Sequence, residues 1–186
     1  GNNNTAIGVY SLVANTTGDT NAALGTGAMV TNTTGRANTA VGSNTLVDNL
    51  SGSCNVATGW CSLKSNTTAC FNTVAGVCSM YSNTTGASNT AMGFCSMSCN
   101  TTAGENTAFG RNSLLLNTTG CCNTALGKDA MALSQTGDGN TAVGVKTLCA
   151  NTTGDNNTAV GSESLKVNTT GAVNTAVGYG ALTTNT

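Results

Sequence analysis

Histidine and proline are absent from this sequence, and charged residues make up only 7% of it. Six basic residues against seven acidic ones give a formal net charge of −1, so the chain has no basic surface that would attract a phosphate backbone or anionic lipid. We therefore expect neither nucleic acid nor a membrane surface to be a partner. No apolar run approaches the roughly 18 to 20 residues of a membrane-spanning helix; the longest leucine cluster is 114–116.

The same absences leave little for catalysis or metal binding. Without histidine, an acid or base would have to come from the seven carboxylates, and these do not gather in pairs: Asp129 and Glu163 share one repeat position but lie two repeats apart. The cysteines form no C-x-x-C pair for a zinc site. Asp19, Asp138 and Asp155 fall at equivalent turn positions and are expected to be solvated. We expect no catalytic residue, no cofactor and no metal site, and so no enzyme.

An unbroken period of seventeen residues organises what is present. It is marked by glycines at 8, 25, 42, 59, 76, 93, 110, 127, 144, 161 and 178. An asparagine stands four residues before each of them, and the consensus is N-T-A-V-G-x-x-S-L-x-x-N-T-T-G-x-x. We number these repeat positions one to seventeen, with Asn4 at position one. Internal repetition of this kind predicts a solenoid or array.

Position nine of the repeat is always Leu or Met and is therefore expected to point into the core. Its members are Leu12, Met29, Leu46, Leu63, Met80, Met97, Leu114, Met131, Leu148, Leu165 and Leu182. Position four is mostly apolar and shares a strand face with position two, which is usually Thr. The glycine at position five and the N-T-T-G segment at positions twelve to fifteen are typical of turns. Each repeat is thus expected to form a strand, a tight turn, a short strand and a turn.

Stacking of the repeats follows from their size. Two or three core side chains, at about 1.5 to 3 kcal/mol each, cannot offset the ordering of one repeat alone. If each repeat is one coil that pairs with its neighbours at about 4.8 Å, the Leu/Met positions form a continuous core in a rod about 50 Å long. The fold class predicted is all-β, a β-solenoid with one coil per repeat. The absence of proline agrees with this, and recurrent Gly and Asn disfavour a helical solenoid.

The asparagines at positions one and twelve predict two further ladders. Stacked Asn side chains can bond amide to carbonyl along the rod and can hold the turns in place. The array spans residues 1–186 as a single domain of eleven coils, the first starting near Asn4, and neither end shows a polar cap. We therefore expect a segment of a longer rod, or a unit that stacks end to end into a filament.

The repeat resembles known surface-protein repeats. The segments 38–46, 157–165 and 174–182 carry N-T-A-V-G-x-x-[STA]-L, which is similar to the head repeats of YadA-like trimeric autotransporter adhesins. The full unit resembles still more the N-T-A-x-G-x-x-A-L-x-x-N-T-T-G arrays of large surface proteins and of phage or virus tail fibres. The resemblance implies a left-handed β-roll in an extracellular fibre, a non-catalytic shaft. It also implies self-association as a homotrimer, with surface glycans or a host receptor as candidate partners.

Position six gives separate support for self-association. It carries large apolar side chains in six repeats, on what should be an outer surface: Val9, Trp60, Val77, Phe94, Val145 and Tyr179. Exposed apolar columns usually mark an interface. The alternative is that position six is half-buried against its own coil.

Position twelve offers candidate N-glycosylation sites, because the sequon N-x-S/T occurs there in nine repeats. The asparagines are Asn15, Asn32, Asn49, Asn66, Asn83, Asn100, Asn117, Asn151 and Asn168. In the segment 49–51 the middle residue is Leu but the hydroxyl is kept, as acceptor chemistry would permit. Against this, the segment 134–136 keeps the hydroxyl and loses the Asn, and position one is as regular without any sequon. A purely structural role for these asparagines remains the alternative.

The nine cysteines also follow the period. Cys61, Cys78 and Cys95 occupy position seven of three consecutive repeats, so they should stack at a Cα spacing of about 4.8 Å, within disulfide range. Cys54 and Cys70 fall in neighbouring turn positions of adjacent coils. Disulfides between coils and free small thiols are both compatible with this pattern.

Ice binding is the alternative function from a different class. Positions thirteen and fourteen are nearly all Thr, and threonine arrays on a flat β-solenoid can bind ice. However, these two positions lie in a predicted turn, whereas a flat face would favour T-x-T on a strand. The interpretation favoured by the sequence is a structural segment of an extracellular fibre.

Overall fold

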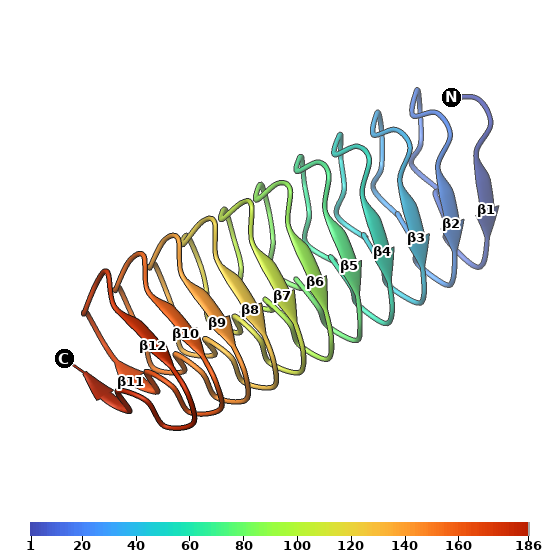
Figure 1. Cartoon of the computed structure of the whole chain (residues 1–186). Helices are drawn as coiled ribbons and strands as arrows, with labels where there is room; N and C mark the ends of the chain where they lie inside the picture. Colours follow the sequence, from blue (N-terminus) through green and yellow to red (C-terminus); the bar gives the residue numbers. More distant parts are fainter. Residues whose placement is uncertain (186) are drawn as a thin grey trace.

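The computed structural model describes residues 1–185 and shows a rod of stacked coils, with the two ends of the chain at opposite ends of the rod (Figure 1). One short strand from each coil joins an eleven-stranded sheet in sequential order. Its strands are β1 (Thr5–Ile7), β2 (Ala22–Leu24), β3 (Thr39–Val41), β4 (Val56–Thr58), β5 (Thr73–Ala75), β6 (Thr90–Met92), β7 (Thr107–Phe109), β8 (Thr124–Leu126), β9 (Thr141–Val143), β10 (Thr158–Val160) and β12 (Thr175–Val177). The predicted β-solenoid is confirmed.

Strand pairing keeps the phase of the sequence repeat. All neighbours in the sheet are parallel, and Thr90 pairs with Thr107 as Met92 pairs with Phe109. Equivalent residues of successive coils therefore lie above one another, and we call each such row a column, numbered by repeat position. The second strand expected in every coil forms only near one end, where β11 (Val167–Asn168) pairs with β13 (Thr184–Asn185). In the other described coils this segment is bent rather than extended.

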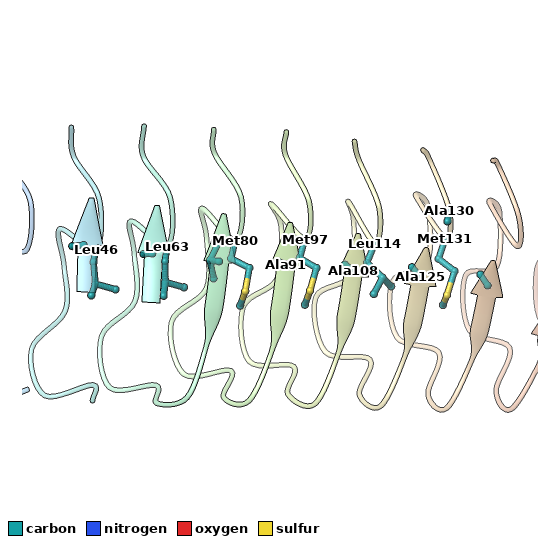
Figure 2. Close-up of a cluster of buried hydrophobic side chains, with 14 of the residues drawn as sticks. Leu46, Leu63, Met80, Ala91, Met97, Ala108, Leu114, Ala125, Ala130 and Met131 are labelled. Atoms are coloured by element: carbon teal, nitrogen blue, oxygen red, sulfur yellow. The ribbon is translucent and has the colours of Figure 1, made fainter. Parts of the chain in front are cut away.

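The apolar core consists mainly of columns three and nine, with alanines of column eight such as Ala28 and Ala130. Met80, Met97 and Leu114 are fully buried and point the same way in successive coils (Figure 2), which confirms the prediction for column nine. Facing them, the middle residue of the strands is a buried alanine in most coils, such as Ala91 and Ala108. Columns two and four flank this alanine and lie on the outer side of the sheet. The sequence correctly placed columns two and four on the same face of the strand. That face is the outside of the rod, so the apolar column four does not belong to the core.

Column nine adopts an uncommon backbone conformation. Every residue in it has a positive φ, between 47° and 53°, which a bulky side chain normally avoids at a cost of about 1 to 2 kcal/mol. Full burial of a Leu or Met contributes about 1.5 to 3 kcal/mol. The backbone N–H is also satisfied: that of Met97 donates to the carbonyl of Ser113 in the next coil at 2.9 Å. The left-handed backbone conformation of this residue turns the chain, and the expected second strand is interrupted there.

The glycine at position five forms the predicted corner. Its φ lies between 122° and 139° in all eleven coils, a region open only to glycine. At Gly110 a Cβ atom would also lie 2.6 Å from the carbonyl oxygen of Gly127 in the next coil. Both the backbone conformation and the close approach of the coils therefore require glycine here.

Column one closes each coil and ties it to its neighbours. The buried Asn89 donates from Nδ2 across the coil to the carbonyl of Ala103 at 2.9 Å. The same Nδ2 lies 3.2 Å from Oδ1 of Asn72 in the preceding coil. Its own Oδ1 accepts the backbone N–H of Asn106 in the following coil at 3.0 Å. The predicted asparagine ladder is therefore confirmed, and it bonds to the backbone as well as to side chains.

Candidate functional surfaces

The asparagines of column twelve form a second buried ladder. Nδ2 of Asn66 donates to Oδ1 of Asn49 in the preceding coil at 2.8 Å and to the carbonyl of Ala69, three residues later, at 3.1 Å. This pattern confirms the prediction that the amides bond along the rod and hold the N-T-T-G turn. Of the nine sequon asparagines, only Asn15, in the first coil, is not fully buried.

Burial bears directly on the candidate glycosylation sites. A sequon glycan is attached to an Asn in a surface loop and is bulky, whereas Asn83 and Asn100 are 0% exposed. Nδ2 of Asn100 already donates two hydrogen bonds, to Oδ1 of Asn83 and to the carbonyl of Ala103. The folded rod leaves no room for a sugar at these nitrogens. The geometry therefore favours the structural alternative, and glycan occupancy stays an untested prediction.

One coil interrupts the column-twelve ladder. Ser134 stands where the other repeats have Asn, and its shorter side chain cannot reach the neighbouring amides. As a result, Oγ of Ser134 and Oδ1 of Asn117 are buried without a hydrogen-bond partner. In the next coil, Nδ2 of Asn151 keeps only its local bond to the carbonyl of Gly154, at 2.8 Å, while its Oδ1 still accepts from Nδ2 of Asn168. The stack nevertheless continues through this coil.

The two threonine columns of the N-T-T-G turn differ from each other. In column thirteen the hydroxyl bonds to the next coil: Oγ1 of Thr84 donates to the carbonyl of Thr101 at 3.0 Å. In column fourteen the side chains, such as Thr85 and Thr102, are exposed, and those in the described chain make no hydrogen bond to protein atoms. The threonines predicted to form a turn therefore do so, and only one of the two columns is free to face a ligand.

The position-seven cysteines stack as predicted in three consecutive coils. Cys61 is buried, Cys78 and Cys95 are half-buried, and φ is 52° to 54° for all three. Burial, followed by the nearby Cys78, raises the pKa of both Cys61 and Cys95. A translational stack also spaces the Cβ atoms by about 4.8 Å, beyond the usual 3.5 to 4.5 Å of a disulfide.

All nine cysteines within residues 1–185 are free thiols. Cys70 does approach the coil of Cys54, because its Sγ accepts the backbone N–H of Ser53 at 3.2 Å. The structure thus stacks the position-seven cysteines and places Cys70 against the backbone next to Cys54, but it gives the disulfide prediction no support.

Column six is exposed in the six coils where it is apolar, which favours the outer-surface interpretation over the half-buried alternative. It is not uniformly apolar, since Arg111 and Lys128 also belong to it. The sequence did not indicate a second exposed surface, the outer side of the sheet, which is made of columns two and four. These two columns hold no charged residue, but the buried columns and the N-T-T-G turn hold none either, so the count of charges does not single them out.

The surface of residues 1–185 has no pocket, and no three metal-ligating side chains of this part of the chain meet. The ion pairs in the same residues join exposed or half-exposed side chains, such as Lys166 and Glu163 at 3.3 Å. Asp129 does not meet Glu163; its Oδ1 instead accepts from Nδ2 of Asn112 at 3.0 Å. The functional possibilities therefore rest on extended surfaces.

No helix in residues 1–185 is long and apolar enough to cross a bilayer. No family model, no curated protein and no solved structure matches the chain.

Proposed function

We propose that this chain is a non-catalytic structural segment of an extracellular fibre, in which stacked coils act as a stiff spacer. The observation that carries the proposal is the continuity of the stack: parallel pairing joins every coil to the next without a change of register. The resemblance of the repeat to adhesin heads and tail-fibre arrays supports the extracellular placement.

The bonding pattern explains how such a segment would carry load. Column one links each coil to both neighbours through backbone and side-chain groups, so stretching the rod breaks many hydrogen bonds together. No coil has a core of its own, and each is stabilised by its neighbours. The exposed columns can change without disturbing this framework. A receptor or surface glycan would have to bind those columns.

Length is the property that tests the spacer role. Deleting residues 55–122 removes four complete repeats and joins position seventeen to position one, so we expect a folded rod shorter by about 19 Å. Deleting 55–118 instead breaks the phase and should prevent the two halves from stacking. Small-angle X-ray scattering gives the maximum dimension of each variant. An unchanged dimension in the first variant would overturn the spacer role.

Placement outside the cell or on a particle needs its own test. Antibodies raised against the folded chain should label fibres on intact cells or particles in immuno-electron microscopy. Labelling that requires disruption of the cell or particle would contradict the extracellular part of the proposal and leave the spacer role standing.

Ice binding remains a second candidate because the structure places a threonine column on the outer side of the strands, which the sequence did not predict. Columns two and four both face outward from the strands, and column two is Thr in nine of the eleven coils: Thr5, Thr39, Thr73, Thr90, Thr107, Thr124, Thr141, Thr158 and Thr175. Thermal hysteresis of the purified chain would support this function, and its absence at millimolar concentration would exclude it.

A further inference from the structure

The outer side of the eleven-stranded sheet is a regular surface that runs along the rod. We define the sheet face as columns two and four, which flank the inward residue of each strand. In β6 and β7 the middle alanine is buried, while Met92 and Phe109 of column four are exposed. The exposed apolar residues of column four are Ile7, Leu24, Val41, Met92, Phe109, Val160 and Val177. Figure 1 shows these strands side by side along one side of the rod.

The sheet face holds no charged residue in any of its eleven coils. All thirteen charged residues lie in other columns: Asp19, Arg36, Asp48, Lys64, Glu105, Arg111, Lys128, Asp129, Asp138, Lys146, Asp155, Glu163 and Lys166. They occupy columns six, seven, ten, eleven, sixteen and seventeen. Protein–protein interfaces have this composition, with few charged residues at the centre and polar or charged residues at the rim.

The size of the face is sufficient for a stable contact. Eleven strands about 4.8 Å apart, each about three residues or 10 Å wide, present about 500 Å² on one rod. Two such faces together bury about 1,000 Å², the lower limit for a specific interface. The neighbouring apolar side chains of column six, such as Trp60 and Phe94, extend the contact beyond this limit.

We propose that the sheet face is the surface on which a second copy of this chain packs. Another rod of the same sequence has the same coil spacing, so its columns stay in step with this face over the whole length. Two flat sheets pack about 10 Å apart through interdigitating side chains of the kind found in column four. The contact requires only the stack of coils, so it does not depend on whether the chain belongs to an extracellular fibre.

The central experiment places charge on the sheet face without disturbing the core. Met92 and Val160 lie in column four of two coils that are separated by three others, and both are exposed. The double variant M92K/V160K should leave the fold intact, because its side chains point outward. The matched control T102K/T170K places the same charges in column fourteen of the same two coils.

Sedimentation velocity and light scattering measure the outcome. The wild-type chain and the control should have a mass of at least twice 18.3 kDa. M92K/V160K should associate at least about tenfold more weakly, because it buries unpaired charges between the rods. Circular dichroism with thermal unfolding must show that both variants remain folded as the wild type does.

Two results would overturn the proposal. One is a single-chain mass for the wild-type protein at about 100 μM, a concentration at which even a micromolar complex is formed. The other is equal association of M92K/V160K and T102K/T170K, which would place the contact elsewhere on the rod. A monomeric wild-type chain that shows thermal hysteresis would assign the sheet face to ice instead of a second copy.

Discussion

The two asparagine ladders lie on different parts of the coil and differ in what they bond. Column one is Asn in every repeat, and its side-chain amides accept a backbone N–H of the following coil and donate to a backbone carbonyl across the interior. Column twelve bonds mainly side chain to side chain and to its own turn, and it tolerates Ser134 in one coil. The comparison indicates that coil stacking depends on the bonds to backbone N–H groups more than on the amide–amide row.

The largest loss of stability should come from a substitution in column one. In N89A the buried N–H of Asn106 loses its acceptor, and the carbonyl of Ala103 loses the bond that closes the coil. An orphaned buried donor together with a small cavity should lower the free energy of unfolding by about 3 to 5 kcal/mol. Urea unfolding followed by circular dichroism measures the change. A loss below 1 kcal/mol would contradict the assigned role of this column.

The matched substitution in column twelve should cost less. Asn100 lies in the same coil as Asn89, and N100A removes partners from side-chain groups alone, Oδ1 of Asn83 and Nδ2 of Asn117. The carbonyl of Ala103 keeps its bond from Asn89. We expect a loss of about 2 kcal/mol in the same urea experiment. If N100A proved as destabilising as N89A, the two ladders would contribute equally to coil stacking.

Restoring the missing asparagine of column twelve should stabilise the protein instead of destabilising it. In S134N the new amide can donate to Oδ1 of Asn117, which is buried without a partner, and can accept from Nδ2 of Asn151. We expect a gain of about 1 to 2 kcal/mol in the free energy of unfolding, because an unpaired buried oxygen becomes bonded. S113N, which alters a buried serine outside the ladder, is the control and should not stabilise the rod. An unchanged or lower stability of S134N would show that the interrupted ladder at Ser134 does not destabilise the rod.

Most of the fold could be predicted because it is periodic. A glycine that recurs at one position, and a Leu or Met that recurs at another, identify the corner and the core without knowledge of the coil shape. The inward alanine of column three could not be identified in the same way, because column four is more hydrophobic and so looks like the better core position. The coil is too thin for both: Met97 fills the interior opposite Ala91, and Met92 is left outside.

The candidate sites were less predictable than the fold. A sequon records three residue types but not burial, and at Asn66 the amide is part of the core. The stacking of Cys61 with Cys78 follows from the period alone. Disulfide formation depends on the Cβ–Cβ distance to within less than an ångström, which the period does not give. The sheet face was missed because alternation along three residues does not show which side is inward.

The smallest expected change in stability distinguishes the two threonine columns at the surface, one of which bonds to the next coil while the other does not. Oγ1 of Thr84 donates to the carbonyl of Thr101, so T84V should lower the free energy of unfolding by about 0.5 to 1 kcal/mol, the usual net value of one hydrogen bond. Thr85, its exposed neighbour, makes no such bond, and T85V should change stability by less than about 0.5 kcal/mol. Both variants keep a β-branched side chain, so turn propensity is matched. Equal losses would mean that the hydroxyl of column fourteen stabilises the turn through water, and the exposed row would then be part of the framework rather than a surface free to bind.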